Sequence, residues 1–452
     1  MTQPGGPAVR IDVQDHPEHS PEQLPRPSCD AAVQPVCAGE TSGPQSCGCD
    51  VSRAIPARRP HGSPWLVIIF GTLSACGPMA TDMYLPALPG IARDLGTSDG
   101  AVQLTLSVFL IGLALGQFLW GTLSDAWGRR LPMLLGSAAF VFASVVCACT
   151  SSITILIGAR FLMGFGGSAG VVVSRAVVRD MFDEHESARF YSLMMIIGGL
   201  APIVAPVLGA ALLAWLHWRA IFWVVAAFAA FCFVGVLWGV PETLARTDRL
   251  EIRFRMVAGR YAGLFRRTDY IGYALAAGFC HALLFAYISS SPFLFIQLYG
   301  VTPQQFSVVF MSNAVGLYAT GQFNRVLLRR LSPRQILMRA VVLNLVIAAI
   351  LLALLVADRA PFPVFVALLF ALVGSLGWIF PNVIAVAMKP VGDQAGSASA
   401  LLGVLQFTFG AASASLVGAL ADGTAIPAVG VITGSSLSSL LILLIFRHLT
   451  RR

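Results

Sequence analysis

Apolar residues along this chain gather into long runs that are separated by short polar stretches. A helix needs about 20 apolar residues to cross about 30 Å of hydrocarbon, and irregular backbone cannot face lipid. The pattern therefore predicts an all-α membrane protein with twelve transmembrane helices. They are expected at residues 65–89, 101–122, 131–150, 153–176, 189–214, 219–239, 270–295, 303–325, 335–357, 362–388, 395–421 and 425–446.

The longest polar stretch between apolar runs is residues 241–269, which is rich in arginine and divides the predicted helices six and six. We expect an N-terminal six-helix half at 65–240, a cytoplasmic loop at 241–269, a C-terminal half at 270–447 and a short cytoplasmic tail at 448–452. Two such halves would enclose a central cavity.

An internal repeat supports this division. Residues in the second and eighth predicted helices, and the arginines that follow them, recur after a shift of 200 positions. Parallel repeats with a binding site between them are a known transporter design. The pairs are Gly116 and Gly316, Gly121 and Gly321, Arg129 and Arg329, and Arg130 and Arg330.

Residues 1–64 differ from the rest, since they are rich in Pro, Gly, Ser and acidic residues and show no periodicity. We expect a disordered cytoplasmic tail. Four of the nine cysteines lie there, with a spacing that fits no good zinc pattern, so no metal is expected. They are Cys29, Cys37, Cys47 and Cys49.

Composition and charge agree with a membrane protein. Only 12% of residues are charged and the mean hydropathy is +0.77, whereas a soluble domain carries about 25% charged residues. The net charge of +8 comes from arginines in one alternating set of loops, and the opposite loops hold only Arg93, Arg219 and Arg359. This asymmetry predicts that both termini are cytoplasmic, and the absence of a basic stripe excludes nucleic acid as the partner.

Asp82 is the residue with the clearest functional implication. It is the one carboxylate set deep inside an apolar segment. An ionisable group in hydrocarbon costs several kcal/mol unless it faces a cavity, finds a partner or carries a proton. Asp82 therefore predicts a proton-handling or cation-binding site in a transporter.

The sequence GTLSDAWGRR at residues 121–130 follows the second predicted helix. It resembles the G-x-L-[AS]-D-x-x-G-R-[RK] motif of the major facilitator superfamily. Gly121 is expected to let two helices approach closely, Asp125 to pair with a base or cap a helix, and the arginines to anchor at the cytoplasmic surface. The resemblance implies that Gly121, Asp125, Gly128, Arg129 and Arg130 form a latch between the halves. Arg325 stands where a second Asp125 would be.

Two further motifs resemble those of the same superfamily. The sequence RFLMGFGG begins at Arg160 in the fourth predicted helix, at a depth that makes Arg160 a possible electrostatic partner of Asp82. The sequence GGLAPIVAPVLG at 198–209 resembles the antiporter motif of drug:proton exporters. It implies a hinge at Gly198, Pro202, Pro206 and Gly209, because proline removes a backbone donor and bends a helix.

Four stretches narrow the resemblance to the Bcr/CflA group of bicyclomycin and chloramphenicol resistance antiporters. They are TDMYLPALP at 81–89, WRAIF at 218–222, FAYISSSPF at 285–293 and AGSASALLGVLQF at 395–407. The resemblance implies drug efflux driven by the proton gradient, with no cofactor. It also implies a monomer in the bacterial inner membrane.

Several polar residues at membrane depth remain as candidates for the substrate cavity: Tyr84, Gln117, Ser290, Asn382 and Gln406. Interhelical hydrogen bonds are the alternative role for each. His281 is expected to be a packed neutral residue or a coupling group. Some related exporters carry a second acid where this chain has Ser74, which argues against export of strongly cationic compounds.

Three other functions share parts of this pattern. A facilitator or symporter of a polar metabolite would have the same fold. A membrane receptor would bind its ligand without moving it. An intramembrane enzyme would need a nucleophile with a base or a metal cluster, and the chain has neither G-x-S-x-G nor H-E-x-x-H.

Overall fold

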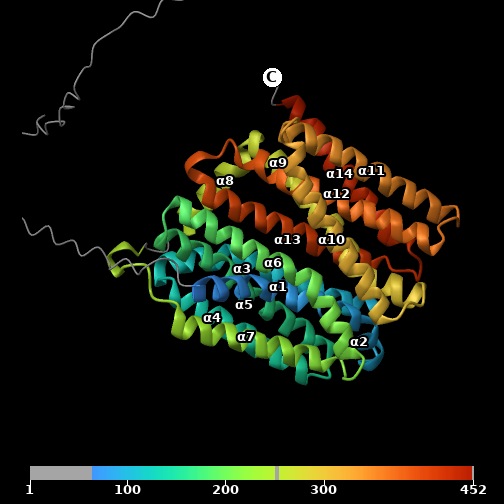
Figure 1. Cartoon of the computed structure of the whole chain (residues 1–452), viewed down its shortest axis with the longest axis horizontal. Coiled ribbons are helices and arrows are strands. Elements are labelled where there is room, and N and C mark those ends of the chain that lie inside the picture. Colours follow the sequence, from blue (N-terminus) through green and yellow to red (C-terminus); the bar gives the residue numbers. More distant parts are fainter. Residues whose placement is uncertain (1–63, 250–253, 450–452) are drawn as a thin grey trace, which may run out of the picture. The chain divides into compact units, whose positions relative to one another are not determined.

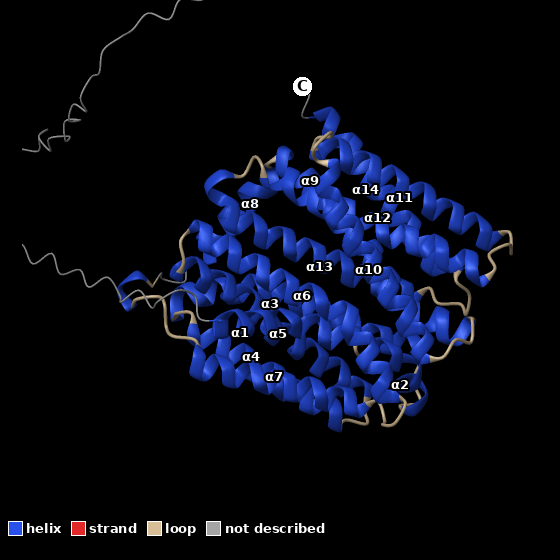
Figure 2. Cartoon of the chain, viewed as in Figure 1, coloured by secondary structure: helices blue, strands red, loops and turns tan. Residues whose placement is uncertain are grey.

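The computed structural model describes residues 64–249 and 254–449, and Figure 2 shows only helices and connecting loops in these two ranges. The expectations for the N-terminal tail and its four cysteines lie outside the described residues. The long helices, in the order labelled in Figure 1, are α1 (Pro64–Asp82), α3 (Asp99–Trp127), α4 (Arg130–Cys149), α5 (Ile153–Met181), α6 (Glu184–Leu213), α7 (Arg219–Gly239), α9 (Thr268–Pro292), α10 (Pro303–Leu327), α11 (Pro333–Val356), α12 (Phe362–Met388), α13 (Ala395–Ala419) and α14 (Ile426–Leu449).

Shorter elements connect some of them. After α1 come the 3₁₀ turn η1 (Leu85–Ala87) and α2 (Leu88–Asp94), and a π-helical turn, η3 (Phe293–Leu298), extends α9. The prediction that 241–269 is only a loop is wrong, because this stretch holds the 3₁₀ turn η2 (Arg246–Asp248) and the helix α8 (Phe254–Arg266). A last 3₁₀ turn, η4 (Gly392–Gln394), precedes α13.

The apolar runs and the long helices agree closely. Within residues 64–249 and 254–449, eleven helices are long and apolar enough to cross a membrane. The prediction for 303–325 coincides with α10, which has 25 residues but is not one of the eleven. Its polar residues explain the difference, since α10 carries Gln304, Gln305, Asn313, Gln322 and Asn324.

Local signals in the sequence fix where several helices begin and end. The hydroxyl of Thr302 accepts from the Gln305 backbone N–H while the Gln305 side chain accepts from the Thr302 N–H, and Ser332 and Gln335 repeat this arrangement before α11. Such reciprocal caps satisfy backbone donors that a helix start leaves unpaired. At the end of α3, Gly128 takes a φ of +93°, which glycine adopts without strain.

The closest approach of α3 and α5 is built on glycines. A Cβ added at Gly112 would overlap backbone atoms of α5, and one added at Gly164 would overlap the Phe109 carbonyl of α3. At Gly121, however, an added Cβ would meet Val172 at an ordinary 3.6 Å. The prediction that Gly121 permits close helix approach is therefore wrong, and the tight contact lies about one and a half to two and a half turns earlier in α3, at Gly116 and Gly112.

The 200-residue repeat reappears in the packing. In the α3–α5 pair the Trp120 indole donates to the Phe165 carbonyl over 2.8 Å, and in the α10–α12 pair the Thr320 hydroxyl donates to the Gly374 carbonyl over 2.6 Å. Positions 120 and 320 thus make equivalent interhelical bonds. This equivalence supports an internal duplication.

Two further helix pairs join the residues before 240 to those after 268. Helix α3 packs along α13, and α6 packs along α10; Figure 1 shows α13 and α10 above α3 and α6. Near the start of α3, a Cβ on Gly100 would lie 2.8 Å from the Gly418 carbonyl oxygen. Glycines therefore permit the tightest part of this crossing.

Candidate functional site

Asp82 lies at the end of α1, where the helix gives way to a turn. Its side chain is buried, with a residue exposure of 5%, as the sequence predicted. In the described part of the chain it accepts one hydrogen bond, from the Thr81 hydroxyl at 3.0 Å. The helix stops here because a proline-rich stretch follows, with Pro86 and Pro89 unable to donate to preceding carbonyls.

Arg160, on α5, is fully buried beside the same end of α1. Its Nη1 donates to the Ala80 carbonyl over 2.9 Å, and its guanidinium carbon lies 4.7 Å from the Tyr84 ring centroid and 4.5 Å from that of Phe109. Nε and Nη2 have no hydrogen-bond partner within residues 64–249 and 254–449. Two aromatic faces and a helix C-terminal carbonyl therefore surround this cation.

The expected pair between Asp82 and Arg160 is not formed in this structure. The bond from Arg160 to Ala80 confirms that the two side chains lie at similar depth, but no ion pair joins them among the described residues. The reason is geometric: the guanidinium is held between Tyr84 and Phe109 on one side of α1, whereas Asp82 faces elsewhere.

Asp82 interacts electrostatically with two tyrosines from the other part of the chain, Tyr287 on α9 and Tyr318 on α10. The turn that follows Asp82, η1, packs against α6, α9 and α10. The Asn313 side-chain N–H donates to the Tyr287 hydroxyl oxygen over 2.7 Å, so the hydroxyl keeps its own hydrogen free to donate. Asp82 therefore lies near the Tyr287 and Tyr318 hydroxyl groups, where α1, α9 and α10 meet.

The sequence analysis did not single out Tyr287, Asn313 or Tyr318 individually. Tyr287 lies in the stretch 285–293 that carried the family resemblance, but Asn313 and Tyr318 carried no motif. Their spacing of five residues on α10 and the tyrosine on α9 become informative only when the helices are placed together. A polar residue in an otherwise apolar segment was the one available signal.

The 198–209 segment of α6 lies between α1 and α10. A Cβ on Gly209 would overlap the carbonyl oxygen of Met83, the residue after α1, and a Cβ on Gly199 would lie 2.6 Å from the Tyr318 hydroxyl. The Pro206 carbonyl accepts from the Ser307 hydroxyl of α10 over 2.9 Å. The structure thus places Gly209 beside Met83, next to Asp82, Pro206 against α10, and Gly198 near Ser74 of α1. The hinge role of Gly198, Pro202, Pro206 and Gly209 stays a prediction.

The 121–130 segment holds a network of charges at the arginine-rich end of the bundle. Arg129 contacts Asp125 at 2.5 Å and Asp180 of α5 at 2.8 Å, so the predicted pairing of Asp125 with a base is confirmed. Burial opposes the charge of Arg129, but the hydrogen bonds to Asp125 and Asp180 outweigh it and raise the pKa of Arg129.

Glu242 is a member of this network that the sequence analysis missed. Its carboxylate accepts from the backbone N–H of Arg129 at 2.8 Å and from that of Arg130 at 3.3 Å, and so it caps the start of α4. A side chain at Gly128 would overlap it. The available signal was one acid just after the sixth apolar run, in a loop otherwise rich in arginine.

These contacts bear on the predicted latch. The partners of Asp125, Arg129 and Arg130 in the described residues all lie before residue 250: Asp180, Leu237 and Glu242 among them. In this structure the segment therefore ties α3 and α4 to α5 and α7. A latch to the other part of the chain stays a prediction.

The structure separates the five candidate cavity residues. Tyr84 bonds to Thr105 at 2.9 Å beneath the Phe222 ring, and the Asn382 amide donates to Asn324 at 2.7 Å. Both are buried interhelical partners, so their assignment to the cavity is not supported. Gln117 lies against Gly403, Gln406 has an unpartnered amide nitrogen, and Ser290 lines a cavity.

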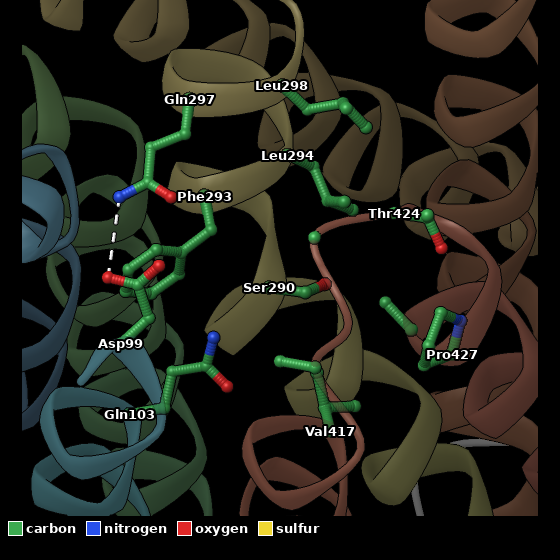
Figure 3. A pocket seen from close by; sticks show the side chains of 13 residues that line it. Asp99, Gln103, Ser290, Phe293, Leu294, Gln297, Leu298, Val417, Thr424 and Pro427 are labelled. Carbon is green, nitrogen blue, oxygen red and sulfur yellow. Dashed lines mark hydrogen bonds between the residues drawn. The ribbon is translucent and has the colours of Figure 1, made fainter.

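That cavity has a volume of about 220 Å³ and lies where α3, α9, α13 and α14 meet. Figure 3 shows Asp99 and Gln103 of α3 on one side and Val417, Thr424 and Pro427 on the other, with Ser290 and the π-helical turn between them. Asp82 does not line it.

His281 packs its ring 4.6 Å from that of Phe380, and its Nδ1 donates to the Ala277 carbonyl over 3.1 Å. This geometry suits a neutral, hydrogen-bonded histidine and supports the packing role over the coupling role. Across the two described ranges, no group of three or more His, Cys, Asp or Glu side chains could hold a metal ion.

Comparison with known proteins adds to this geometry. The profile of the Major Facilitator Superfamily matches residues 70–415. An uncharacterized MFS-type transporter of Bacillus subtilis, YdgK, is 37% identical over 80% of this chain and 90% of its own length. A bicyclomycin resistance protein homolog of Haemophilus influenzae is 31% identical, again over 80% of this chain and 90% of its own length.

Solved structures agree on the fold. The crystal structure of a D-xylose-proton symporter superposes with a TM-score of 0.68 at 12% identity, over 84% of this chain and 96% of the other. Identity this low shows the fold alone.

Proposed function

This chain belongs to the Major Facilitator Superfamily, in the bicyclomycin and chloramphenicol resistance group, and we propose that it exports small drug-like or amphipathic organic compounds in exchange for protons. The bicyclomycin resistance relative supports this class of substrate. The observation that carries the coupling is Asp82, a buried carboxylate near Tyr287 and Tyr318 of the other part of the chain.

The architecture that we infer has twelve transmembrane helices, with α10 as the twelfth, in two six-helix halves at 65–240 and 270–447. The equivalent bonds of Trp120 and Thr320 support it. Both termini would be cytoplasmic in the bacterial inner membrane, since the arginines gather at one end. The protein would act as a monomer and take its energy from the proton gradient, without a cofactor.

Export would follow from alternating access to Asp82. A proton from the acidic outer side would neutralise the carboxylate, and release to the cytoplasm would restore the charge that attracts the next substrate. Because η1 packs on α6, α9 and α10, movement of one half against the other changes what Asp82 faces. Arg160 would hold the end of α1 in place, the 198–209 segment would bend, and the 121–130 segment would stabilise the outward-facing state.

Everted membrane vesicles with an imposed pH gradient test this function. Antiport accumulates a drug only when the lumen is acidic, and Asp82→Asn should abolish that accumulation while the protein remains in the membrane in normal amount. The matched control is Asp358→Asn, which removes the same charge from the loop between α11 and α12 and should transport normally. Full gradient-driven export by the Asp82→Asn variant would exclude proton coupling at this residue.

The same vesicles separate antiport from a facilitator or symporter. A symporter accumulates substrate when the lumen is alkaline, and a facilitator only equilibrates it. A resistance screen across compound classes in an efflux-deficient strain, with Asp82→Asn as the inactive reference, identifies the compounds to use.

A further inference from the structure

The cavity between α3, α9, α13 and α14 has the chemistry of a binding site. Its volume of about 220 Å³ suits a small organic molecule rather than a few waters. Phe293, Leu294 and Leu298 form one apolar wall and Val417 and Pro427 form the other. Because Asp82 does not line it, this site is separate from the proposed coupling residue.

The cavity lining carries negative charge without a positive one. Asp99 is the only charged residue among those lining it, and no ion pair to Asp99 is formed in the described residues. Gln297 donates one weak hydrogen bond to it over 3.4 Å. In Figure 3 the Asp99 carboxylate stands beside the Phe293 ring, below Gln297. A helix N-terminus favours an acid at this position, but that preference does not explain a carboxylate without a cation at the rim of a cavity.

Gln103 gives a second, independent indication. Its residue exposure is only 2%, and its Oε1 has no hydrogen-bond partner among the residues that the structure describes. A buried acceptor left unpaired costs about 1–3 kcal/mol, so such groups normally have a partner. Figure 3 shows the Gln103 amide between Asp99 and Ser290, where rotation of the amide presents either its oxygen or its nitrogen to the cavity.

The Ser290 hydroxyl completes the polar face. It donates to the Ala286 carbonyl at 2.7 Å, which leaves its oxygen able to accept. Asp99 and Gln103 therefore offer polar groups from one side of the space and Ser290 offers an acceptor in the middle, with Val417 and Pro427 on the opposite side. A ligand that matches them carries a positive charge with N–H donors at one end and a hydrophobic body at the other.

We propose that this cavity binds monocationic amphiphiles, with a primary or secondary ammonium group between Asp99, Gln103 and the Phe293 ring. An ammonium group there gains a charge-assisted hydrogen bond to the carboxylate and attraction to the ring face. The site supplies a second carboxylate that the apolar core lacks at Ser74. It would be a transient binding site for cationic substrates between Asp82 and the end of the bundle where α3 begins.

A ligand-observed NMR titration tests the site, with 2-phenylethylammonium as probe and the full chain in lipid nanodiscs. The neutral 2-phenylethanol is the matched compound, and empty nanodiscs correct for partition into lipid. No gradient is applied, so binding can succeed or fail independently of the proposed transport. We expect saturable binding of the cation, no competition by the alcohol at the same concentration, and weaker binding by about tenfold or more in Asp99→Asn.

Two further variants make the result decisive. Asp358→Asn should bind the probe as the unaltered chain does. Val417→Phe, which fills the cavity from α13 without changing Asp99, should abolish binding, and it tests the proposal if Asp99→Asn does not fold. Unchanged affinity in both Asp99→Asn and Val417→Phe would overturn the proposal.

Discussion

Arg160 donates a hydrogen bond to the backbone oxygen of Ala80 over 2.9 Å and thereby ties α5 to the last turn of α1. The last carbonyls of a helix lack intrahelical partners, and the helix dipole makes that end attractive to a cation. Arg160 thus acts on Asp82 by fixing the backbone two residues before it, without forming an ion pair. This arrangement leads to predictions for Arg160 and for the groups around Asp82.

Arg160→Lys should lower export at a fixed pH gradient by about tenfold, because lysine lacks the planar group that lies between Tyr84 and Phe109 and reaches Ala80. Vesicle transport at matched protein levels measures the effect. Arg160→Met leaves the Ala80 carbonyl without its partner and should therefore lower export more than Arg160→Lys does. Equal transport by the lysine variant and the unaltered chain would contradict a positioning role.

Tyr287→Phe should keep the stacking of the ring on Phe310, whose centroid lies 5.7 Å away, but remove the hydroxyl that accepts from Asn313 and lies near Asp82. We expect proton-driven export to fall by roughly tenfold, less than the about 10²–10⁴-fold that a positioned acid or base contributes. The rate is measured as a function of lumen pH.

Tyr299→Phe is the control for that variant. The Tyr299 hydroxyl makes only a long 3.5 Å bond to the Ala360 carbonyl, so its loss should leave export unchanged. If both variants lose activity equally, the effect belongs to packing and not to the hydroxyl beside Asp82.

Gly209→Val should destabilise the protein, because any Cβ at this position overlaps the Met83 carbonyl. Overpacking of this kind costs about 1–3 kcal/mol, which should appear as a lower midpoint in a thermal unfolding assay on detergent-purified protein. Gly158→Ala, in α5, is the matched control: nothing lies within 4 Å of its added Cβ. The same assay should show no loss there, since alanine favours a helix over glycine.

Glu242→Ala should remove the acceptor for the backbone N–H groups of Arg129 and Arg130 at the start of α4 and lower thermal stability by about 0.5–2 kcal/mol. Glu242→Gln keeps an acceptor oxygen but loses the charge, so its unfolding midpoint should lie between those of Glu242→Ala and the unaltered chain. Glu186→Gln changes an exposed acid in the first turn of α6 and should be neutral. A Glu242→Ala midpoint equal to that of the control would show that water replaces the cap.

Much of the fold could be predicted, because hydrocarbon permits so few solutions. The run at 219–239 coincides with α7 and the run at 362–388 with α12, since a long apolar segment can only be a helix in lipid. Helix α8 was missed because Arg255, Arg260 and Arg266 interrupt its apolar residues, so that no apolar run long enough to cross a membrane forms. The polar residues of α10 likewise separate it from the eleven apolar helices.

The candidate site was predicted in part. The burial of Asp82 followed from its place in an apolar segment. Pairing with a base was one of two roles expected for Asp125, but only the structure identified Arg129 as that base. Glu242 lies 113 positions from Arg129, too far for any local pattern to connect them. Tyr84 and Asn382 were assigned to the cavity because a sequence gives depth but not the direction in which a side chain points.

The sequence by itself determined where the chain crosses the apolar phase and that one carboxylate lies within it, because both depend on transfer free energies that add along the chain. Only the tertiary structure decided that Arg160 contacts Ala80 instead of Asp82, that Tyr287 and Tyr318 face Asp82, and that Asp99 and Gln103 share a cavity with Ser290. Those outcomes depend on distances between helices far apart in the chain. Such distances are set by the side chains that fill the space between helices, and the hydrophobic periodicity of a sequence does not specify how those side chains pack.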